Sequence, residues 1–203
     1  MRYFVTAIGT DSGKTFISAA LALALEADYW KPVQAGFPTD SEKVAKLTKG
    51  KVKIHPEQYV LKTPASPHTA AEVENIEIHL SDFQLPRREN LIVEGAGGCL
   101  VPLNQRDFVI DLAKLWSLEV ILISDNYLGS INHTLLTLEY LKQQNIPIKG
   151  LIFNGPSNQS GEDIIMQHAG CPCIMKVPHY ESCNAGTVQM LANQLKSRWY
   201  ELG

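Results

Sequence analysis

Apolar runs rich in β-branched residues alternate with helical patterns along the whole chain. Two of these runs, LIVEG and VILIS, are continuously apolar, which is typical of strands covered on both faces. Strands that alternate with helices favour a mostly parallel sheet flanked by helices on both faces. The sequence therefore predicts an α/β fold, with one domain spanning residues 1–203. The expected strands are Tyr3–Thr6, Tyr29–Val33, Leu91–Glu94, Val120–Ser124, Leu151–Asn154 and Ile174–Val177, and the expected helices are Lys14–Glu26, Asp107–Trp116, Ile131–Gln144, Gly161–Ala169 and Thr187–Tyr200.

The middle segment, from Gly50 to Arg88, is weakly patterned, polar and interrupted by prolines. We expect it to wrap the sheet with loops and short helices. In sheets of this kind ligands bind at the carboxyl ends of the strands. The residues that follow each strand are therefore the first candidates for function.

Composition excludes several classes of protein. A formal net charge of −3 argues against a protein that binds nucleic acid by neutralising phosphates. No apolar run approaches the roughly 20 residues that span a bilayer, and MRYFVT leads straight into a strand without a leader pattern. The four cysteines fit neither a redox motif nor a zinc site, so we expect reduced thiols beside or within strands. These features predict a cytoplasmic protein that binds neither nucleic acid nor membrane.

The stretch AIGTDSGKT, residues 7–15, joins the first expected strand to the first expected helix. It ends like a phosphate-binding loop, but Ile8 stands where the common G-x₄-G-K-[ST] pattern has its first glycine. Fixing both ends gives Ala7-x₅-Gly-Lys-Thr, which is one residue longer. In such a loop the backbone N–H groups hold phosphate oxygens, Lys14 reaches the outer phosphates and Thr15 binds Mg²⁺. The alternative is a chance GKT in a turn.

Three charged residues follow at later points of the chain. Lys31 is costly to bury unless its ammonium meets an anion, and the alternative is a surface lysine at a strand edge. Asp40 is either the N-cap of a helix or a carboxylate that helps to hold Mg²⁺ beside Thr15. Glu94, in VEGAGG, ends the most apolar strand and resembles the metal-binding or water-organising acid of ATPases, with an exposed turn residue as the alternative. The glycines after it let the backbone approach a ligand.

Two further positions have open alternatives. Gly129 and Ser130 precede a helix and form either an anion site for a substrate carboxylate or an ordinary cap. Asn154 either contacts a purine edge or forms a turn. One side of the C-terminal helix is apolar, which favours core packing over a membrane or partner face. The residues on that side are Val188, Leu191, Leu195 and Trp199.

Together these motifs resemble the dethiobiotin synthetase family. GKT, YWKPVQAG, TDS, PASPHTAA, VEGAGG, LGSINHTLLT, a strand ending in Asn and VPHY occur in that family's order and spacing over essentially the whole chain. GKT is shared with very many NTPases. KPV-x-x-G, VEGAGG followed by CLVPL, and LG-x-INH are more specific. The family also has the longer phosphate loop.

The resemblance implies a P-loop NTPase-like fold and an ATP- and Mg²⁺-dependent ligase of biotin biosynthesis. Its substrate is 7,8-diaminopelargonic acid, and its product is dethiobiotin. One amine takes up CO₂ as a carbamate, which ATP phosphorylates to a carbamic–phosphoric anhydride, and the second amine closes the ring. The implied partners are the diamine, CO₂ or bicarbonate, ATP and a second copy of the chain, with the sites near the homodimer interface.

The resemblance also implies a role for each matching residue. Lys31 and Lys14 would be catalytic, with Lys31 bridging the carbamate and the γ-phosphate. The metal ligands would be Thr15, Asp40 and Glu94. The ATP contacts would include Lys14, Thr15, Asp40 and Glu94, and also Thr10, Asp11, Ser12, Gly13, Phe16, Gly95, Ala96, Gly97, Asn154, Gly155, Pro178, His179 and Tyr180. The substrate contacts would be Ala35, Gly129, Ser130, Ile131 and Asn132.

Three positions depart from the family, and two rival functions share its superfamily. Ala35 stands where the family usually has a hydroxyl residue, Ala7 replaces the first glycine of the loop, and Asp11 replaces a frequent Glu. A P-loop amidotransferase or small-molecule kinase is one rival, but the chain has no room for a glutaminase module and no evident kinase lid. A partitioning ATPase is the other, although that class carries an extra lysine early in the loop, where this chain has none.

Overall fold

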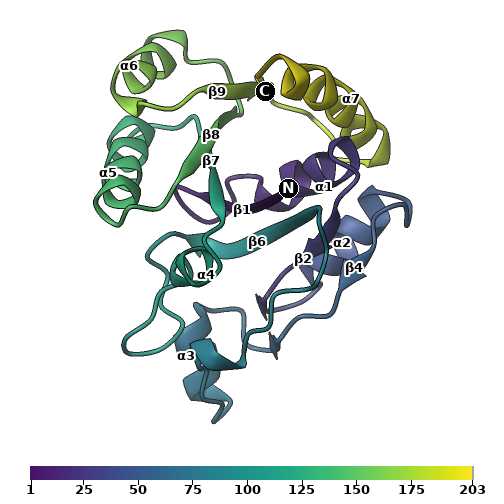
Figure 1. Ribbon diagram of the computed structural model, residues 1–203, viewed down its shortest axis with the longest axis vertical. Helices are drawn as coiled ribbons and strands as arrows, with labels where there is room; N and C mark the ends of the chain where they lie inside the picture. Colours follow the sequence, from purple (N-terminus) through teal and green to yellow (C-terminus); the bar gives the residue numbers. More distant parts are fainter. Residues whose placement is uncertain (203) are drawn as a thin grey trace.

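The computed structural model describes residues 1–202, with side chains for residues 1–199. Its centre is a seven-stranded parallel sheet in the order β4-β2-β6-β1-β7-β8-β9 (Figure 1). Strands β3 and β5 form a separate parallel pair. The predicted α/β class is therefore confirmed. The strands are β1 (Arg2–Ala7), β2 (Asp28–Trp30), β3 (Val33–Ala35), β4 (Ile54–His55), β5 (Tyr59–Leu61), β6 (Leu91–Gly98), β7 (Glu119–Asp125), β8 (Ile148–Asn154) and β9 (Cys173–Val177).

Helices cover both faces of the sheet (Figure 1). In β6, Leu91 and Val93 pack into the core on one face while Ile92 packs on the other. This two-sided burial explains the continuously apolar strand sequences. One face carries α1 (Lys14–Ala24), α2 (Asp40–Leu47) and α7 (Ala185–Leu202), and the other carries α3 (Pro67–Val73), the 3₁₀ turn η1 (Leu80–Asp82), α4 (Asp111–Leu115), α5 (Ser130–Gln143) and α6 (Gln159–Ala169).

The expected strand Tyr29–Val33 is wrong as a single element. Strand β2 ends at Trp30, and the chain turns at Lys31 and Pro32 into β3. Pro32 has no N–H to donate to a neighbouring strand, so the ladder cannot continue through it. Lys31 therefore follows a strand instead of lying inside one.

Two other expectations need correction. The middle segment contains the short helical elements we expected, but it also contains β4 and β5, which are too short to show a strand period. The helix expected from Asp107 begins only at Asp111. The preceding residues form a hairpin in which Pro102 pairs with Phe108 and the Val109 N–H donates to the Val101 carbonyl at 2.9 Å.

The C-terminal helix packs by its apolar side, as expected. Val188, Leu191 and Leu195 are fully buried, and the Trp199 ring lies edge-on to Tyr3 at 5.2 Å between centroids. The membrane-face and partner-face alternatives for this side are therefore wrong. Among the described residues, no helix is long and apolar enough to cross a membrane.

All four cysteines are free thiols. Cys99 is buried, which raises the pKa of its thiol to about 11, and Cys171 and Cys173 flank or belong to β9. Cys183 differs from the expectation, since it is exposed in the connection before α7 and is not beside a strand.

Candidate active site

The phosphate-binding loop follows β1 directly, and α1 begins at Lys14. Gly13 caps this helix in the left-handed region, with φ at 83°. A Cβ at this position would overlap the amide of Asn154, whose Nδ2 donates to the Ser12 carbonyl at 3.0 Å. Only glycine fits both the backbone and the neighbour, so Gly13 fixes the shape of the loop. The placement between strand and helix makes a chance GKT match the poorer interpretation.

A cavity of about 980 Å³ opens beside this loop. It lies at the carboxyl edge of the sheet, where we expected the functional residues. Its wall is formed by residues 10–16, 33–38 and 64–67, together with Lys31, Asp40, Lys43, Lys46, Leu47, Glu94, Ala96, Gly97, Val101 and Cys183.

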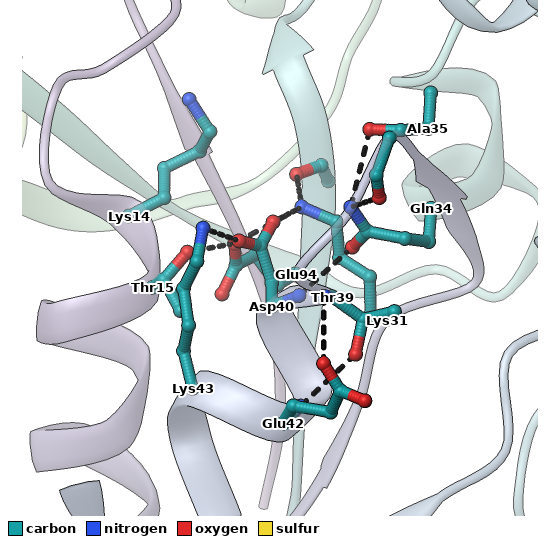
Figure 2. Close-up of polar contacts among 12 residues, drawn as sticks. Lys14, Thr15, Lys31, Gln34, Ala35, Thr39, Asp40, Glu42, Lys43 and Glu94 are labelled. Carbon is teal, nitrogen blue, oxygen red and sulfur yellow. Dashed lines mark hydrogen bonds and ion pairs between the residues drawn. The ribbon is translucent and has the colours of Figure 1, made fainter. Parts of the chain in front are cut away.

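Glu94 lies at the centre of the polar network in Figure 2 and is 1% exposed. Its Oε1 accepts hydrogen bonds from the Thr15 hydroxyl at 2.9 Å and from Lys31 Nζ at 3.0 Å. Its Oε2 accepts a hydrogen bond from the Tyr29 hydroxyl at 3.0 Å. The interpretation of Glu94 as an exposed turn residue is therefore wrong.

Lys31 is 4% exposed, so the surface-lysine alternative is also wrong. Its ammonium lies 2.8 Å from Asp40 Oδ2 and 3.0 Å from Glu94 Oε1, and it donates to the Gly95 carbonyl at 3.1 Å. Burial alone would lower the pKa of Lys31, but the carboxylates of Glu94 and Asp40 raise it above its ordinary value. The side chain is therefore a fixed cation at the wall of the cavity.

Asp40 is the first residue of α2 and not its N-cap. Thr39 is the cap, and it forms a capping box with Glu42. The Asp40 carboxylate is then free to bind Lys31 and, through Oδ1, Lys43 Nζ at 3.0 Å. Burial would raise the pKa of Asp40, but Lys31 overrides it and lowers the pKa to about 2. The N-cap alternative is wrong, and Asp40 remains a candidate metal ligand.

Lys14 places a second ammonium in the loop. Its Nζ donates to the Gly9 carbonyl at 2.7 Å. Burial, followed by repulsion from Lys31, lowers the pKa of Lys14 to about 8. Two buried ammoniums on one cavity favour a strongly anionic ligand such as a triphosphate.

Two buried residues of this network were missed from the sequence. Gln34 donates to the carbonyls of Ala35 and Gly36 and accepts from the Asp40 N–H at 3.0 Å. Tyr29 is fully buried, and burial followed by the Glu94 charge raises the pKa of its phenol well above the ordinary value. The sequence could have pointed to Tyr29, because it lies in an expected strand two residues before Lys31. A buried tyrosine usually needs a hydrogen-bond partner for its hydroxyl.

Two of the three glycines after Glu94, Gly95 and Gly97, make room for protein side chains. A Cβ on Gly95 would lie 3.1 Å from the Phe4 ring, and one on Gly97 would lie 2.7 Å from Val101. Gly97 also has φ at 66°. The missing side chains of Gly95 and Gly97 therefore allow close packing, and Gly97 also allows the left-handed backbone conformation. Ala96 and Gly97 line the cavity.

Several predicted contact residues lie outside this cavity wall. Asn154 contacts the phosphate-binding loop from the far side, and the Tyr180 ring packs on Phe16 at 5.6 Å between centroids. Gly155 donates its N–H to the Val177 carbonyl at 3.0 Å, which joins the ends of β8 and β9. The substrate contacts proposed at 129–132 lie at the start of α5, and neither they nor Gly155, Pro178 and His179 line this cavity.

The side-chain oxygen atoms beside the loop are too few to bind a metal ion unless a bound ligand supplies further donor atoms. Among the described residues, no group of three His, Cys, Asp or Glu side chains forms a complete metal site. Two carboxylates, those of Asp40 and Glu94, converge with the Thr15 hydroxyl. Mg²⁺ is typically bound by one or two protein carboxylates, with phosphate oxygens and water as its other ligands. This small set of oxygen donors therefore suits Mg²⁺.

Comparison with known proteins identifies the family. A family model described as an AAA domain matches residues 1–187. A relative from Cytophaga hutchinsonii, named ATP-dependent dethiobiotin synthetase BioD, is 52% identical over 98% of this chain and 99% of its own length. A protein of the same name from Christiangramia forsetii is 41% identical over 98% of each chain.

Similar solved structures support the fold alone, because their sequences are distant. The cell division ATPase MinD of Pyrococcus furiosus aligns with a TM-score of 0.60 at 14% identity, covering 100% of this chain and 99% of its own. A ParA family ATPase from Chlorobium tepidum gives 0.53 at 14% identity, covering 95% and 97%. The much higher identity to the synthetases favours that function over a partitioning ATPase. The chain belongs to the family of ATP-dependent dethiobiotin synthetases, which are ligases that form C–N bonds.

Proposed function

We propose that this chain converts 7,8-diaminopelargonic acid, CO₂ and ATP to dethiobiotin, ADP and phosphate. The observation that carries the proposal is the position of Lys31. Its buried ammonium lies between two carboxylates on the wall of a cavity that also contains the phosphate-binding loop. Family membership supports the same reaction.

The chemistry needs charge neutralisation more than a protein nucleophile. One substrate amine adds to CO₂ and loses a proton, giving a carbamate. A carbamate oxygen then attacks the γ-phosphorus of ATP, and ADP leaves. The second amine attacks the carbamoyl carbon, phosphate leaves with the anhydride oxygen, and a further proton is lost. Lys14 and Lys31 would stabilise the negative charge on the phosphoryl and carbamate oxygens.

Thr15, Asp40 and Glu94 would hold the Mg²⁺ ion. Their oxygen donors fit a hard cation, and they lie beside the loop that would hold the triphosphate. When bound, Mg²⁺ supplies positive charge to the phosphate oxygens. Lys31 stands next to this position and faces the cavity, where it would orient the carbamate.

The adenine would lie across the loop from Lys31. Asn154 and Tyr180 both pack against the loop or the start of α1, which supports an adenine site bordered by Asn154, Gly155 and residues 178–180. This side of the loop lies at the carboxyl ends of β8 and β9. The nucleotide would therefore span the loop, with its phosphates toward Lys14 and Thr15.

A homodimer would explain the position of Gly129–Asn132. These residues lie at the start of α5, where Leu128 just before the helix is fully exposed and Leu136 within it is 61% exposed, and we take these two leucines as the dimer surface. A second copy would cover that surface and bring Gly129–Asn132 to the substrate carboxylate of its partner. Replacing Leu128 by Asp should produce monomers in sedimentation experiments, and a variant that sediments like the unaltered protein would contradict this surface.

The activity is tested by product analysis. The purified protein, supplied with the diamine, bicarbonate and Mg·ATP, should form a cyclic urea together with ADP, detected by mass spectrometry. Omitting the diamine should stop ADP formation. ATP turnover that is independent of the diamine and forms no urea would contradict the proposed function.

A further inference from the structure

Tyr29 is joined to the reacting region by a hydrogen bond to Glu94. The phenol is fully buried and donates to Glu94 Oε2 at 3.0 Å. The other carboxylate oxygen, Oε1, accepts from Thr15 and Lys31. The two oxygens of one carboxylate therefore have separate tasks, with Oε1 on the cavity side and Oε2 held by the protein interior.

The register of the sheet fixes this contact. Tyr29 pairs with Ile92 of β6 on one side and with Ile54 of β4 on the other. Glu94 lies two residues after Ile92 on the same strand, so its side chain is on the same face as the Tyr29 ring. The Tyr29 N–H also donates to the Lys53 carbonyl at 2.9 Å. Because the Tyr29 backbone is held between two strands and its ring is fully buried, the ring has little freedom to move away from the carboxylate.

Glu94 needs such a restraint. A glutamate side chain has several rotatable bonds, and ordering it costs conformational entropy. In the part of the chain that the structure describes, Tyr29 is the one donor to Oε2, so its loss would leave a buried carboxylate oxygen without a protein partner, which is an unfavourable state. The carboxylate would then turn to share Thr15 or Lys31 between its two oxygens.

We propose that Tyr29 is a positioning residue that holds Glu94 with Oε1 alone directed to Thr15 and the metal position. This inference rests on the proposed metal role of Glu94. Tyr29 does not line the cavity, so it is not placed to touch the reacting atoms itself. It acts by preorganising one ligand, so that no reorientation of Glu94 is needed when Mg·ATP binds.

The test is Tyr29→Phe, which removes the hydroxyl and preserves the ring. The probe is a non-hydrolysable ATP analogue, whose affinity is measured by calorimetry with Mg²⁺ and again in EDTA. With Mg²⁺ the affinity should fall about fivefold, and in EDTA it should not change. Turnover at saturation should fall about tenfold with an unchanged KM for the diamine, as expected for one lost hydrogen bond to a charged group.

Tyr3→Phe is the matched control. Tyr3 is also a buried strand tyrosine, in the same apolar layer, but it lies at the start of β1 against Trp199. It should leave both affinities and the turnover unchanged. An equal loss of affinity with Mg²⁺ and in EDTA for Tyr29→Phe would indicate a general effect on the fold and overturn the proposal, and so would unchanged affinities and turnover.

Glu94→Gln separates this inference from the proposed function. If Glu94→Gln abolishes the Mg²⁺-dependent gain in affinity while Tyr29→Phe leaves it intact, only the positioning role of Tyr29 fails. If Glu94→Gln itself keeps the full Mg²⁺-dependent gain, the metal role of Glu94 fails, and the positioning role fails with it.

Discussion

The short strand β2 has a charged cluster around a buried carboxylate at each end, and the two clusters differ in what surrounds them. At its amino end Asp28 is 5% exposed, and its Oδ2 lies 2.8 Å from both His55 Nε2 and Arg88 Nε. At its carboxyl end Lys31 lies between Glu94 and Asp40. Both clusters contain a buried carboxylate with cationic or potentially cationic partners.

Among the described residues, the carboxyl-end cluster lines the cavity beside the phosphate-binding loop and the amino-end cluster does not. Asp28, His55 and Arg88 come from β2, β4 and the connection before β6, and none of them lines the cavity beside the phosphate-binding loop. Their ion pairs join β2 to the edge strand β4 and to the connection before β6. Lys31, Asp40 and Glu94 all line that cavity. A buried charge therefore does not by itself mark a functional site; its access to a ligand does.

The largest effect should come from Lys31→Met. Removing the ammonium leaves charge on the carbamate and phosphoryl oxygens without a partner, so kcat should fall about a thousandfold. Binding of an ATP analogue should change far less, because Lys14 and the loop N–H groups remain. Turnover and analogue affinity are measured together, with circular dichroism to confirm folding. Unchanged turnover would remove Lys31 from the mechanism.

Asp28→Asn should act only on stability. The variant leaves Arg88 and His55 without a carboxylate, and because the Arg88 side chain is half-exposed we expect a loss of about 2 kcal/mol in the free energy of unfolding. Turnover should stay unchanged. Urea denaturation measures the loss, and Asp163→Asn, on the exposed surface of α6, is the control. A large loss of kcat in folded Asp28→Asn would show that the two ends of β2 are functionally coupled.

The two ends were also unequally predictable from the sequence. Lys31, Asp40 and Glu94 were found because each has a charge that needs a partner and lies in or beside a recognisable element, an expected strand for Lys31 and Glu94 and the start of a helical run for Asp40. The Asp28 cluster has no such marker. It joins residues 27 and 60 positions apart, and β4, which supplies His55, is only two residues long.

Contacts across the sheet explain what the sequence could not predict inside the site. Alternating elements determined the fold class, and the GKT motif located the loop. The Tyr29–Glu94 contact depends on the register that pairs Tyr29 with Ile92, and the Asn154–Ser12 contact joins residues 142 positions apart. Neither register nor such distant contacts are visible in the local pattern.

Gln34→Ala should have an intermediate effect. The Gln34 side chain holds the carbonyls of Ala35 and Gly36 and the N–H of Asp40, so its loss loosens the connection from β3 to α2. We expect kcat to fall about tenfold, as for a small number of lost hydrogen bonds. Steady-state assays measure this, with Gln58→Ala as an exposed control. Normal kinetics would show that Asp40 is held well enough by Lys31 and Lys43.

The smallest expected effect comes from Ala35→Ser. Ala35 lines the cavity near Lys31, at a position where the family resemblance leads us to expect a hydroxyl. A serine hydroxyl there can hydrogen-bond the diamine or its carbamate, so the KM for the diamine should fall about threefold, while the KM for ATP stays unchanged. Ala65→Ser, on the same cavity wall, is the matched control and should alter neither constant.

Equal responses of Ala35→Ser and Ala65→Ser would contradict a specific contact at residue 35. A lower KM for Ala35→Ser alone would sharpen the contrast between the two ends of β2. Near Lys31, one added hydroxyl would then change the affinity for a ligand, because the charged groups there share a cavity with it. The charges around Asp28 do not line that cavity, so changes there can alter the stability of the fold but not the affinity for the diamine.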